Sequence, residues 1–595
     1  MSRYLDRIEV PKDLKMLSKK ELSELCGEIR ELMITRLGAT GGHIGSNLGM
    51  IEATVALHYV FDSPVDQIIF DVSHQCYTHK LLTGRKSAYL DPEEYDSVSG
   101  FTNPAESEHD IFSIGHTSTA ISLASGLAKS RDLKGEKNNV IAVVGDGALS
   151  GGEALEGLNN AATLGSNLII VINDNDMSIA ENHGGLYQNL RLLRETGGTA
   201  ECNLFRALGL DYCFIRNGNN INTVIDVLSR IKHINHPIVV HMCTMKGYGY
   251  LLAERNKENW HYKDPFDVGT GKVLLKTETH DTYENLTRDF LVEKMQKDST
   301  IVAITAGTPK IFGFDENLRK QYSKQFVDVG IAEEHAIAMA SGIAKNGGKP
   351  VFGVSSSFLQ RAYDQLSQDL ALNHSPAVIL VFFAGISQGS QTHMGIFDIA
   401  LAINIPNLIY LAPTCKEEYF HMLEWGLEQN ENSVMIRVPG IVATSRNVAL
   451  LSSYSQPVQY EVVEQGRKVA ILALGKFFSL GKGVKDRLEE ATGIKATLIN
   501  PRYITGVDVE LLEQLKENHQ LVIILEDGVI DGGFGEKIAR YYGCSSMKVL
   551  NFGARKEFVD WVTVEEQYEK YHLTVEQIVS DIFYELKSPD FPETC

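Results

Sequence analysis

The sequence lacks the long apolar run that would cross a membrane. No stretch of its 595 residues approaches the roughly 20 consecutive apolar residues that a bilayer-spanning helix needs. The N-terminal stretch MSRYLDRIEVPKDLKMLSKKELSELC carries charges throughout and has no apolar core of signal-peptide length. We therefore expect a cytoplasmic protein with no membrane partner.

Cysteine is sparse and follows no pattern. The eight cysteines include no C-x-x-C pair and no regular spacing, which argues against a disulfide framework. The spacing of His74, Cys76 and His79 matches no common zinc pattern. We expect reduced thiols and no structural zinc.

Basic residues are also in short supply. The chain has 56 Lys and Arg against 76 Asp and Glu, which gives a formal net charge of −20 and a pI near 5.4. A polyanion would be repelled by such a surface, so nucleic acid is not an expected partner. An anionic small substrate would need basic residues gathered locally.

What the sequence does contain is a repeated alternation of short apolar segments with amphipathic ones. This alternation predicts an α/β protein whose parallel sheets are flanked by helices, and the length predicts about three domains. Boundaries are expected at a polar stretch after residue 255 and before QPVQY, which gives domains 1–270, 280–450 and 456–595. Strands are predicted at 67–72, 140–145, 168–173, 238–243, 300–305, 350–355, 377–383 and 521–527.

One stretch, residues 145–176, places polar groups after two successive predicted strands. A strand at 140–144 leads into Gly-Asp-Gly, a helix at 153–164 follows, and a strand at 168–172 leads into Asn-Asp-Asn-Asp. Because the carboxyl ends of parallel strands meet at one edge of a sheet, Asp146 and Asn175 should lie close together. The glycines allow a diphosphate to approach the backbone, and the two side chains suit Mg²⁺. The helix should bury one face, which comprises Ala154, Leu155, Leu158, Ala161 and Ala162.

Two other interpretations of this stretch exist. Gly145, Gly147 and Gly151 are close to a dinucleotide fingerprint, and Asp174 stands where a ribose-binding acid would be. The glycines could also form a turn with no ligand. Asp146 disfavours NAD, since it would face the pyrophosphate without a metal, but an NAD-dependent oxidoreductase remains the alternative of a different class.

The spacing of 29 residues from Asp146 to Asn175, ending in N-D-N-D-M-S-I, resembles the thiamine diphosphate motif of 1-deoxy-D-xylulose-5-phosphate synthases, a branch of the transketolase group. Further segments that resemble this family are GGHIGSNLGM (41–50), SIGHTSTAIS (113–122), VDVGIAEEHAIAMASGIA (327–344) and SSFLQRAYDQL (356–366). The resemblance implies a diphosphate-binding, a pyrimidine-binding and a transketolase C-terminal domain, each with a mainly parallel sheet. It also implies a homodimer and a place in isoprenoid and thiamine biosynthesis.

The resemblance assigns site residues to this chain. Asp146, Asn175 and the carbonyl of Met177 would hold Mg²⁺. Glu333 would bond the ring nitrogen of the aminopyrimidine, and without that shared proton the cofactor would stay idle. By itself an acid in a first helical turn would indicate no more than a favourable interaction with the helix dipole. The residues around thiamine diphosphate would be His74, Ser113, Gly115, His116, Gly147, Ala148, Asn175, Lys246, Phe358 and Arg361.

Histidines would handle protons of the substrate. In the family, the residues that match His43, His261 and His393 face the reacting carbons, where a group that titrates near neutrality is useful. Any one of them could otherwise be an ordinary core or surface histidine. The implied reaction decarboxylates pyruvate and joins the remaining unit to an aldehyde, glyceraldehyde 3-phosphate in the family. Two-carbon transfer of the transketolase type is the alternative within this group.

The acceptor side departs from the family pattern. Ser355 replaces a tyrosine, Phe383 and Gly440 stand where arginines are expected, and the segment 387–393 is one residue shorter and lacks an aspartate. We expect weak binding of the acceptor phosphate unless Arg361 or Arg437 has been recruited. Phe382 and Phe383 would instead offer apolar surface to the acceptor.

Overall fold

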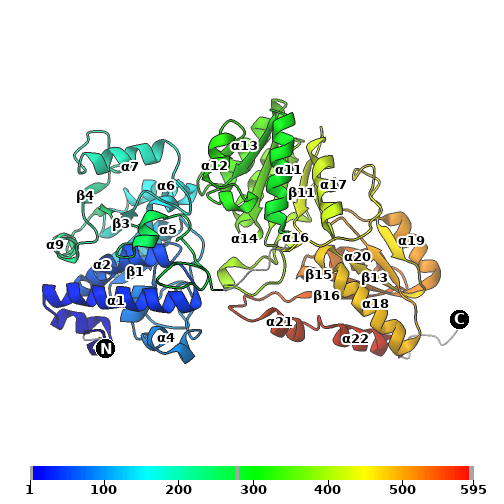
Figure 1. The fold of residues 1–595 in the computed structure, drawn as a ribbon, viewed down its shortest axis with the longest axis horizontal. Coiled ribbons are helices and arrows are strands. Elements are labelled where there is room, and N and C mark those ends of the chain that lie inside the picture. The colour runs from blue at the N-terminus through cyan, green and yellow to red at the C-terminus, as the bar shows by residue number, and fades with distance from the viewer. Residues whose placement is uncertain (1–3, 275–280, 588–595) are drawn as a thin grey trace. The chain divides into compact units, whose positions relative to one another are not determined.

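A computed structural model describes residues 4–274 and 281–587 of the chain (Figure 1). The described residues fall into two compact units. The first contains those up to 274 together with 330–332, and the second contains the others from 281 onward. No helix among these residues is long and apolar enough to cross a membrane.

The first unit is built on one parallel sheet of five strands in the order β1-β2-β3-β5-β4. Alternate residues of β2 enter two separate cores, with Ile141 in one and Ala142 in the other. Both faces of the sheet are therefore buried, as its continuous apolar strands predict. The strands are β1 (Gln67–Phe70), β2 (Val140–Gly145), β3 (Leu168–Asp174), β4 (Asp211–Ile215) and β5 (Pro237–Cys243).

Helices cover the two faces of this sheet. The first core includes side chains of α1 (Lys19–Thr40), α2 (Ile44–Val60) and α9 (Ile221–Ile231). The second includes side chains of α5 (Ala120–Lys134), α6 (Gly152–Ala161) and α7 (Gly185–Glu195). In α6, Ala154, Leu158 and Ala161 are buried as predicted, but the prediction for Leu155 was wrong. Leu155 is 41% exposed because the buried face follows the spacing i, i+3, i+4, i+7 (Ala154, Gly157, Leu158, Ala161), and Leu155 lies one position outside it.

The second unit contains two sheets. A parallel sheet has the order β10-β11-β9-β8-β6-β7, and a second sheet has the order β12-β14-β13-β15-β16, in which only the β12–β14 pair is antiparallel. The first comprises β6 (Ile301–Thr305), β7 (Phe326–Asp328), β8 (Lys349–Ser355), β9 (Val378–Phe382), β10 (Leu408–Leu411) and β11 (Ser433–Arg437). The second comprises β12 (Glu461–Glu464), β13 (Lys468–Ala473), β14 (Thr497–Asn500), β15 (His519–Val529) and β16 (Lys548–Ala554).

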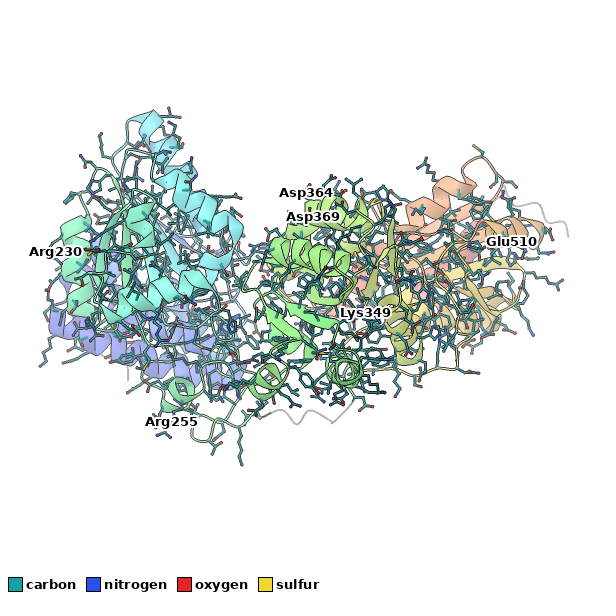
Figure 2. All side chains as sticks on the ribbon, turned by 90° about the horizontal axis from the view of Figure 1, so that it is seen from above. Arg230, Arg255, Lys349, Asp364, Asp369 and Glu510 are labelled. Carbon is teal, nitrogen blue, oxygen red and sulfur yellow. The ribbon has the colours of Figure 1, made fainter. Side chains whose placement is uncertain are left out.

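The helices of the second unit complete an α/β architecture. They include α11 (Tyr283–Lys297), α13 (Glu333–Lys345), α17 (Lys416–Leu427), α18 (Phe478–Thr492), α19 (Val509–Asn518), α20 (Phe534–Tyr542), α21 (Val564–Lys570) and α22 (Val575–Lys587). Charged side chains such as Arg230, Arg255 and Glu510 lie exposed at the periphery (Figure 2). The predicted fold class is confirmed: the chain forms mainly parallel sheets flanked by helices. The exact domain boundaries remain a prediction.

Candidate active site

In the first unit, the loops after β2 and β3 bring Asp146 and Asn175 to the same edge of the sheet. Gly145 and Asn173 pair in the parallel register, so the loops that follow start side by side. Asp146 Oδ2 accepts hydrogen bonds from the backbone N–H of Met177 at 3.1 Å and from Asn182 Nδ2 at 2.8 Å. The loop after β3 is thus folded over the carboxylate of Asp146.

The electrostatics of this loop pair favour a bound cation. Burial raises the pKa of Asp146 to about 8; Asp174 adds to the rise and Lys246 opposes it. Asn175 Oδ1 is buried and accepts no hydrogen bond from any residue that the structure describes. A hard cation such as Mg²⁺ would bind an oxygen of Asp146 and Oδ1 of Asn175, and it would keep the Asp146 carboxylate ionised. These residues therefore fit the predicted metal.

Asp174 has a different role from its neighbours. Its carboxylate accepts hydrogen bonds from His241 Nε2 at 2.7 Å and, through both oxygens, from Arg194 Nη1 at 2.8 Å. Although burial opposes them, these bonds hold its pKa below the ordinary value. Because both oxygens are engaged inside the unit, Asp174 does not serve as the ribose acid of a dinucleotide site.

Close packing shapes the loops around Gly147. A Cβ added to Gly147 would lie 2.8 Å from Ser178 Oγ, so only glycine fits there. Ser118 Oγ donates to the carbonyl of Ala148 at 2.7 Å and thereby ties the 113–118 segment to the Gly147–Ala148 turn. This segment carries the predicted Ser113, Gly115 and His116. The arrangement brings together the glycine-containing backbone segments that the resemblance assigns to a diphosphate.

Three predicted histidines of the first unit form one cluster. The ring centroids of His43, His74 and His261 are 5.1–5.5 Å apart from one another. His261 Nδ1 lies 3.0 Å from Lys246 Nζ, which also donates to the carbonyl of Ser178 at 2.6 Å. The cluster therefore adjoins the Gly147 region through Lys246 and Ser178.

In the second unit, Glu333 is the first residue of α13 and is 2% exposed. Its Oε2 accepts no hydrogen bond from the described residues, and Arg361 Nη1 lies 3.9 Å away. Burial raises the pKa of Glu333 to about 7, with Arg361 opposing the rise. A buried acid that is about half protonated at neutral pH can share a proton with a ring nitrogen.

Phe358 and His393 lie together in the second unit. Their rings meet edge to face with centroids 5.5 Å apart. His393 Nδ1 lies 2.8 Å from Thr392 Oγ1, and burial lowers the pKa of His393 to about 4. The imidazole is therefore neutral at physiological pH, whereas the sequence led us to expect a group that titrates near neutrality. In this form it can accept a proton but has none that it releases readily.

The residues expected on the acceptor side lie in different environments. Phe382 is 2% exposed and belongs to the core, so the expectation that it offers apolar surface was wrong; as the last residue of β9 it points into the sheet packing. Phe383, with φ +53°, is 49% exposed. Arg437 is buried and bonded to both Asp398 and Asp527, so it is not available to a substrate phosphate.

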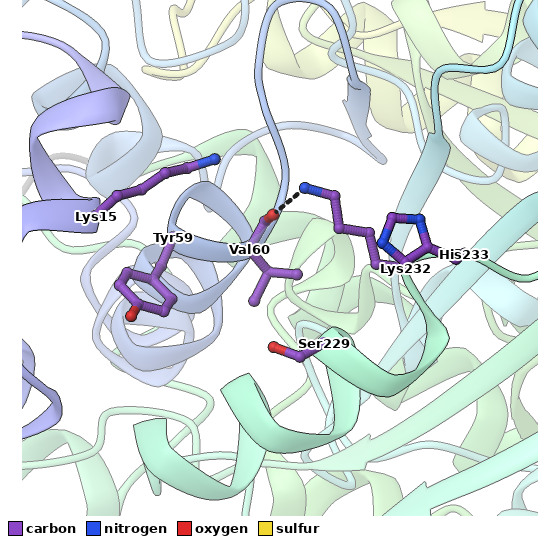
Figure 3. Close-up of a pocket in the computed structure, with 6 residues that line it drawn as sticks. All are labelled: Lys15, Tyr59, Val60, Ser229, Lys232 and His233. Carbon is purple, nitrogen blue, oxygen red and sulfur yellow. Dashed lines mark hydrogen bonds between the residues drawn. The ribbon is translucent and has the colours of Figure 1, made fainter.

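A pocket of about 340 Å³ in the first unit involves none of the predicted residues (Figure 3). Lys232 Nζ in this pocket donates to the carbonyl of Val60 at 2.7 Å and to Asp62 at 2.8 Å. The charge of Lys232 is therefore already compensated within the protein. The pocket is lined by Lys15, Tyr59, Val60, Ser229, Lys232 and His233.

Comparison with known proteins gives a consistent result along the chain. A profile described as 1-deoxy-D-xylulose-5-phosphate synthase matches residues 5–201 and 196–244. Profiles of the transketolase pyrimidine binding domain and C-terminal domain match residues 281–441 and 459–578. The 1-deoxy-D-xylulose-5-phosphate synthase of Caldanaerobacter subterraneus is 38% identical over 623 residues, which cover 98% of this chain and 99% of the relative. That of Clostridium acetobutylicum is 37% identical over 621 residues, with the same coverage.

The chain belongs to the 1-deoxy-D-xylulose-5-phosphate synthase family. It is therefore an enzyme, a transferase of the transketolase group. A solved transketolase from Leishmania mexicana is only 16% identical, with a TM-score of 0.43 over 97% of this chain and 99% of that one, so the assignment depends on the sequence relatives.

The structure divides the predicted synthase residues into two groups. The group in the first unit comprises His43, His74, Ser113, Gly115, His116, Asp146, Gly147, Ala148, Asn175, Met177, Lys246 and His261. The group in the second unit comprises Glu333, Phe358, Arg361 and His393. Sequence reasoning missed Asn182, which donates to Asp146, and Arg194, which donates to the neighbouring Asp174, because neither belongs to a recognisable motif.

Proposed function

We propose that the chain decarboxylates pyruvate with thiamine diphosphate and Mg²⁺ and transfers the two-carbon unit to an aldehyde. The observation that carries this proposal is a pair of buried oxygens, Asn175 Oδ1 and Glu333 Oε2, that accept no hydrogen bond from the described residues. Buried acceptors without donors are rare unless a ligand completes them. When bound, the cofactor would supply a nucleophilic thiazolium carbon and an electron sink for the decarboxylation of a 2-keto acid.

In this proposal the first unit holds the charged end of the cofactor. Asp146, Asn175 and the carbonyl of Met177 bind Mg²⁺, which neutralises the diphosphate. The Gly147–Ala148 turn, the segment containing Ser113, Gly115 and His116, and Lys246 contact the phosphate oxygens. His74 packs against the cofactor from the same side.

The second unit acts on the pyrimidine and on substrate protons. Glu333 would share a proton with the ring nitrogen, and Phe358 would contact the ring. Arg361 limits how far the pKa of Glu333 rises. His393 is neutral, so it can accept a proton from the substrate and return it afterwards. His43 and His261 of the first unit are the other histidines that the resemblance assigns to substrate protons.

The reaction can be tested with purified protein, thiamine diphosphate, Mg²⁺ and labelled pyruvate. Release of labelled carbon dioxide that depends on an added aldehyde, with a ketose product, is expected. Cleavage of a ketose without carbon dioxide release would identify a transketolase instead. An absorbance change of NAD without either event would support the oxidoreductase and contradict the proposal.

We further propose that glyceraldehyde 3-phosphate is a poor acceptor for this chain. Phe383 and Gly440 provide no guanidinium, and Arg437 is locked between two aspartates. Each charge-assisted bond to a phosphate contributes about 1.5–3 kcal/mol, so the loss of two should raise KM by a factor of hundreds or more. An uncharged aldehyde should compete well.

Phe383→Arg is the sharpest test of this acceptor preference. Residue 383 has φ +53° with either side chain, so the exchange adds charge without new backbone strain, whereas arginine at Gly440 (φ +152°) would be strained. The KM for glyceraldehyde 3-phosphate should fall at least about tenfold. Leu372→Arg, at a site that is 64% exposed, is the charge-matched control. A wild-type KM in the low micromolar range with no gain from Phe383→Arg would show that other residues bind the phosphate.

A homodimer in the cytoplasm is part of the proposal. A shallow groove is formed in part by α13, whose Ala338, Met339, Gly342 and Ile343 line it, and we expect a second copy to cover it. The described cysteines are all thiols, which fits a reducing compartment. Sedimentation of the wild type as a dimer and of Met339→Glu as a monomer is expected.

A further inference from the structure

The loop that carries His393 is packed on the C-terminal sheet. It connects β9 to α16 (Asp398–Ala402). Ile386 and Ile396, which flank the loop, are 4% and 2% exposed and belong to the same core as residues of β13 and β15. Met394 and Phe397 pack against that core as well. The surroundings of His393 are thus set largely by residues more than 70 positions further along the chain.

Hydrogen bonds hold the two ends of this loop in place. The N–H of Gly385 donates to the carbonyl of Gly395 at 2.6 Å, and Ser356 Oγ donates to the same carbonyl at 3.1 Å. Lys476 Nζ, which is paired with Asp527 at 3.1 Å, donates to the carbonyl of Ile386 at 3.2 Å. These contacts fix where the loop begins and ends but leave the segment between them to other partners.

Residues 559–567 supply those partners. The N–H of Trp561 donates to the carbonyl of Gly389 at 2.8 Å, and Gln567 Nε2 donates to the carbonyl of Ser387 at 3.1 Å. Asp560 Oδ1 accepts the N–H of Gln391 at 3.0 Å. Two of these three contacts depend on a side chain, so substitution can remove them.

The contact of Asp560 reaches the short turn that ends in His393. Residues Gln391–His393 form a single 3₁₀ turn, whose first N–H groups have no partner within the turn. Ser390 Oγ accepts the N–H of Thr392 at 3.3 Å, and Asp560 accepts that of Gln391. The orientation of the turn, and with it of the His393 ring, therefore depends on a carboxylate from the C-terminal domain.

We propose that Asp560 and Gln567 are positioning residues for His393, so that the C-terminal domain sets the geometry of a proton-transfer group in the pyrimidine-binding domain. This inference rests on the proposed role of His393. Neither residue touches substrate in this account. They act through the loop backbone, and small displacements of a reacting group are costly, about 100-fold for 1 Å.

Three variants test the proposal in the full-length enzyme loaded with thiamine diphosphate and Mg²⁺. Asp560→Ala removes the acceptor for Gln391, Asp560→Asn keeps an oxygen there, and Gln567→Glu replaces the donor by an isosteric acceptor that repels the Ser387 carbonyl. Glu569→Ala, at an exposed position of α21, is the control.

Amide hydrogen exchange of the peptide containing Ser387–His393 should accelerate about tenfold in Asp560→Ala and Gln567→Glu, since each loses one hydrogen bond to this loop. Gln567→Glu also loses the bond from Nε2 to the carbonyl of Val562, which lies outside the loop. Their kcat should fall about 10- to 100-fold while the Kd for thiamine diphosphate stays within about twofold. Asp560→Asn should recover to within about threefold of wild type. Glu569→Ala should match wild type in every measurement.

Unchanged exchange and kcat in Asp560→Ala would overturn the proposal, as would equal losses in Asp560→Asn and Asp560→Ala. If Asp560→Ala does not fold, Gln567→Glu decides by the same two measurements. His393→Ala separates this inference from the proposed function: full activity in His393→Ala would refute the role of His393. Faster exchange in Asp560→Ala would then still show that Asp560 orders the loop.

Discussion

Two buried carboxyl groups, Asp146 in the first unit and Glu333 in the second, differ in how the protein surrounds them. Asp146 accepts two hydrogen bonds, from Met177 and Asn182, and lies near a second acid, Asp174. Glu333 Oε2 accepts no hydrogen bond from the described residues and has a single cation, Arg361, at 3.9 Å. Burial raises the pKa of both, to about 8 and about 7.

The difference shows what each carboxyl group needs from a ligand. Hydrogen bonds from an amide and a backbone N–H stabilise the ionised form of Asp146, and only a cation can offset its neighbouring acid. Glu333 has no such donors, so its proton is the ready partner for a ring nitrogen. One site is therefore built to hold positive charge and the other to exchange a proton.

The largest expected effect comes from Glu333→Ala. Turnover should fall about 10³- to 10⁴-fold because the proton-sharing group is gone, while thiamine diphosphate still binds through the first unit. Steady-state rates and titration calorimetry measure the two quantities. Glu334→Gln in the same helical turn is the control. Turnover of Glu333→Ala within tenfold of wild type would show that Glu333 is not the proton-sharing group that distinguishes it from Asp146.

Asp146→Ala should act on binding rather than on turnover of the bound form. Loss of one partner from a buried charged pair costs about 3–5 kcal/mol, so the Kd for thiamine diphosphate with Mg²⁺ should rise a few hundred- to a few thousand-fold. Circular dichroism should remain that of wild type. Glu156→Ala, on the exposed side of α6, should bind normally. An unchanged Kd in calorimetry would refute the metal assignment.

The raised pKa of Glu333 predicts how stability depends on pH. A carboxyl whose pKa is higher in the folded state binds more protons there, so its contribution to stability is lost as pH rises from 4.5 through about 7. Glu333→Gln has no such proton to lose. Without ligands, the stability of Glu333→Gln relative to wild type should increase by about 3 kcal/mol across this window. Thermal midpoints at pH 5 and pH 8 measure the change, and a relative midpoint that falls with pH would contradict it.

Arg361→Met should have the smallest effect. Removal of the guanidinium lets the pKa of Glu333 rise further, so the corresponding limb of the pH profile of kcat/KM for pyruvate should move up by less than about one pH unit. Arg361→Lys should restore most of the wild-type profile. A profile that does not move would show that Arg361 has no influence on Glu333.

Most of the first sheet could be predicted from sequence because its strands are continuous apolar runs. Strands were predicted at 140–145 and 168–173, and β2 and β3 span Val140–Gly145 and Leu168–Asp174. By contrast, β4 (Asp211–Ile215) was missed, because it is an edge strand whose first residue is exposed and charged. The five residues DYCFI are partly buried without an alternating pattern, so neither a continuous apolar run nor a period of two marks the strand.

The residues of the candidate site could be predicted from motifs, whereas the residues that hold them in position could not. Asp146 and Asn175 follow strand ends, where ligand-binding residues are expected. The residues that orient them or the His393 loop, such as Asn182 and Asp560, lie in segments with no motif of their own. Their roles depend on tertiary contacts between distant parts of the chain, which spacing alone does not reveal. The same limit explains the error at Phe382, whose burial is decided by the packing around β9.

The packing of the 384–397 loop on the C-terminal sheet also bears on how this enzyme could be recombined with its relatives. A chimera joined near residue 456 would take the loop from one parent and residues 559–567 from another. Such an exchange would separate the parental partners of the Gln391–Asp560 and Ser387–Gln567 pairs. Functional hybrids should therefore be those in which these two segments are inherited together.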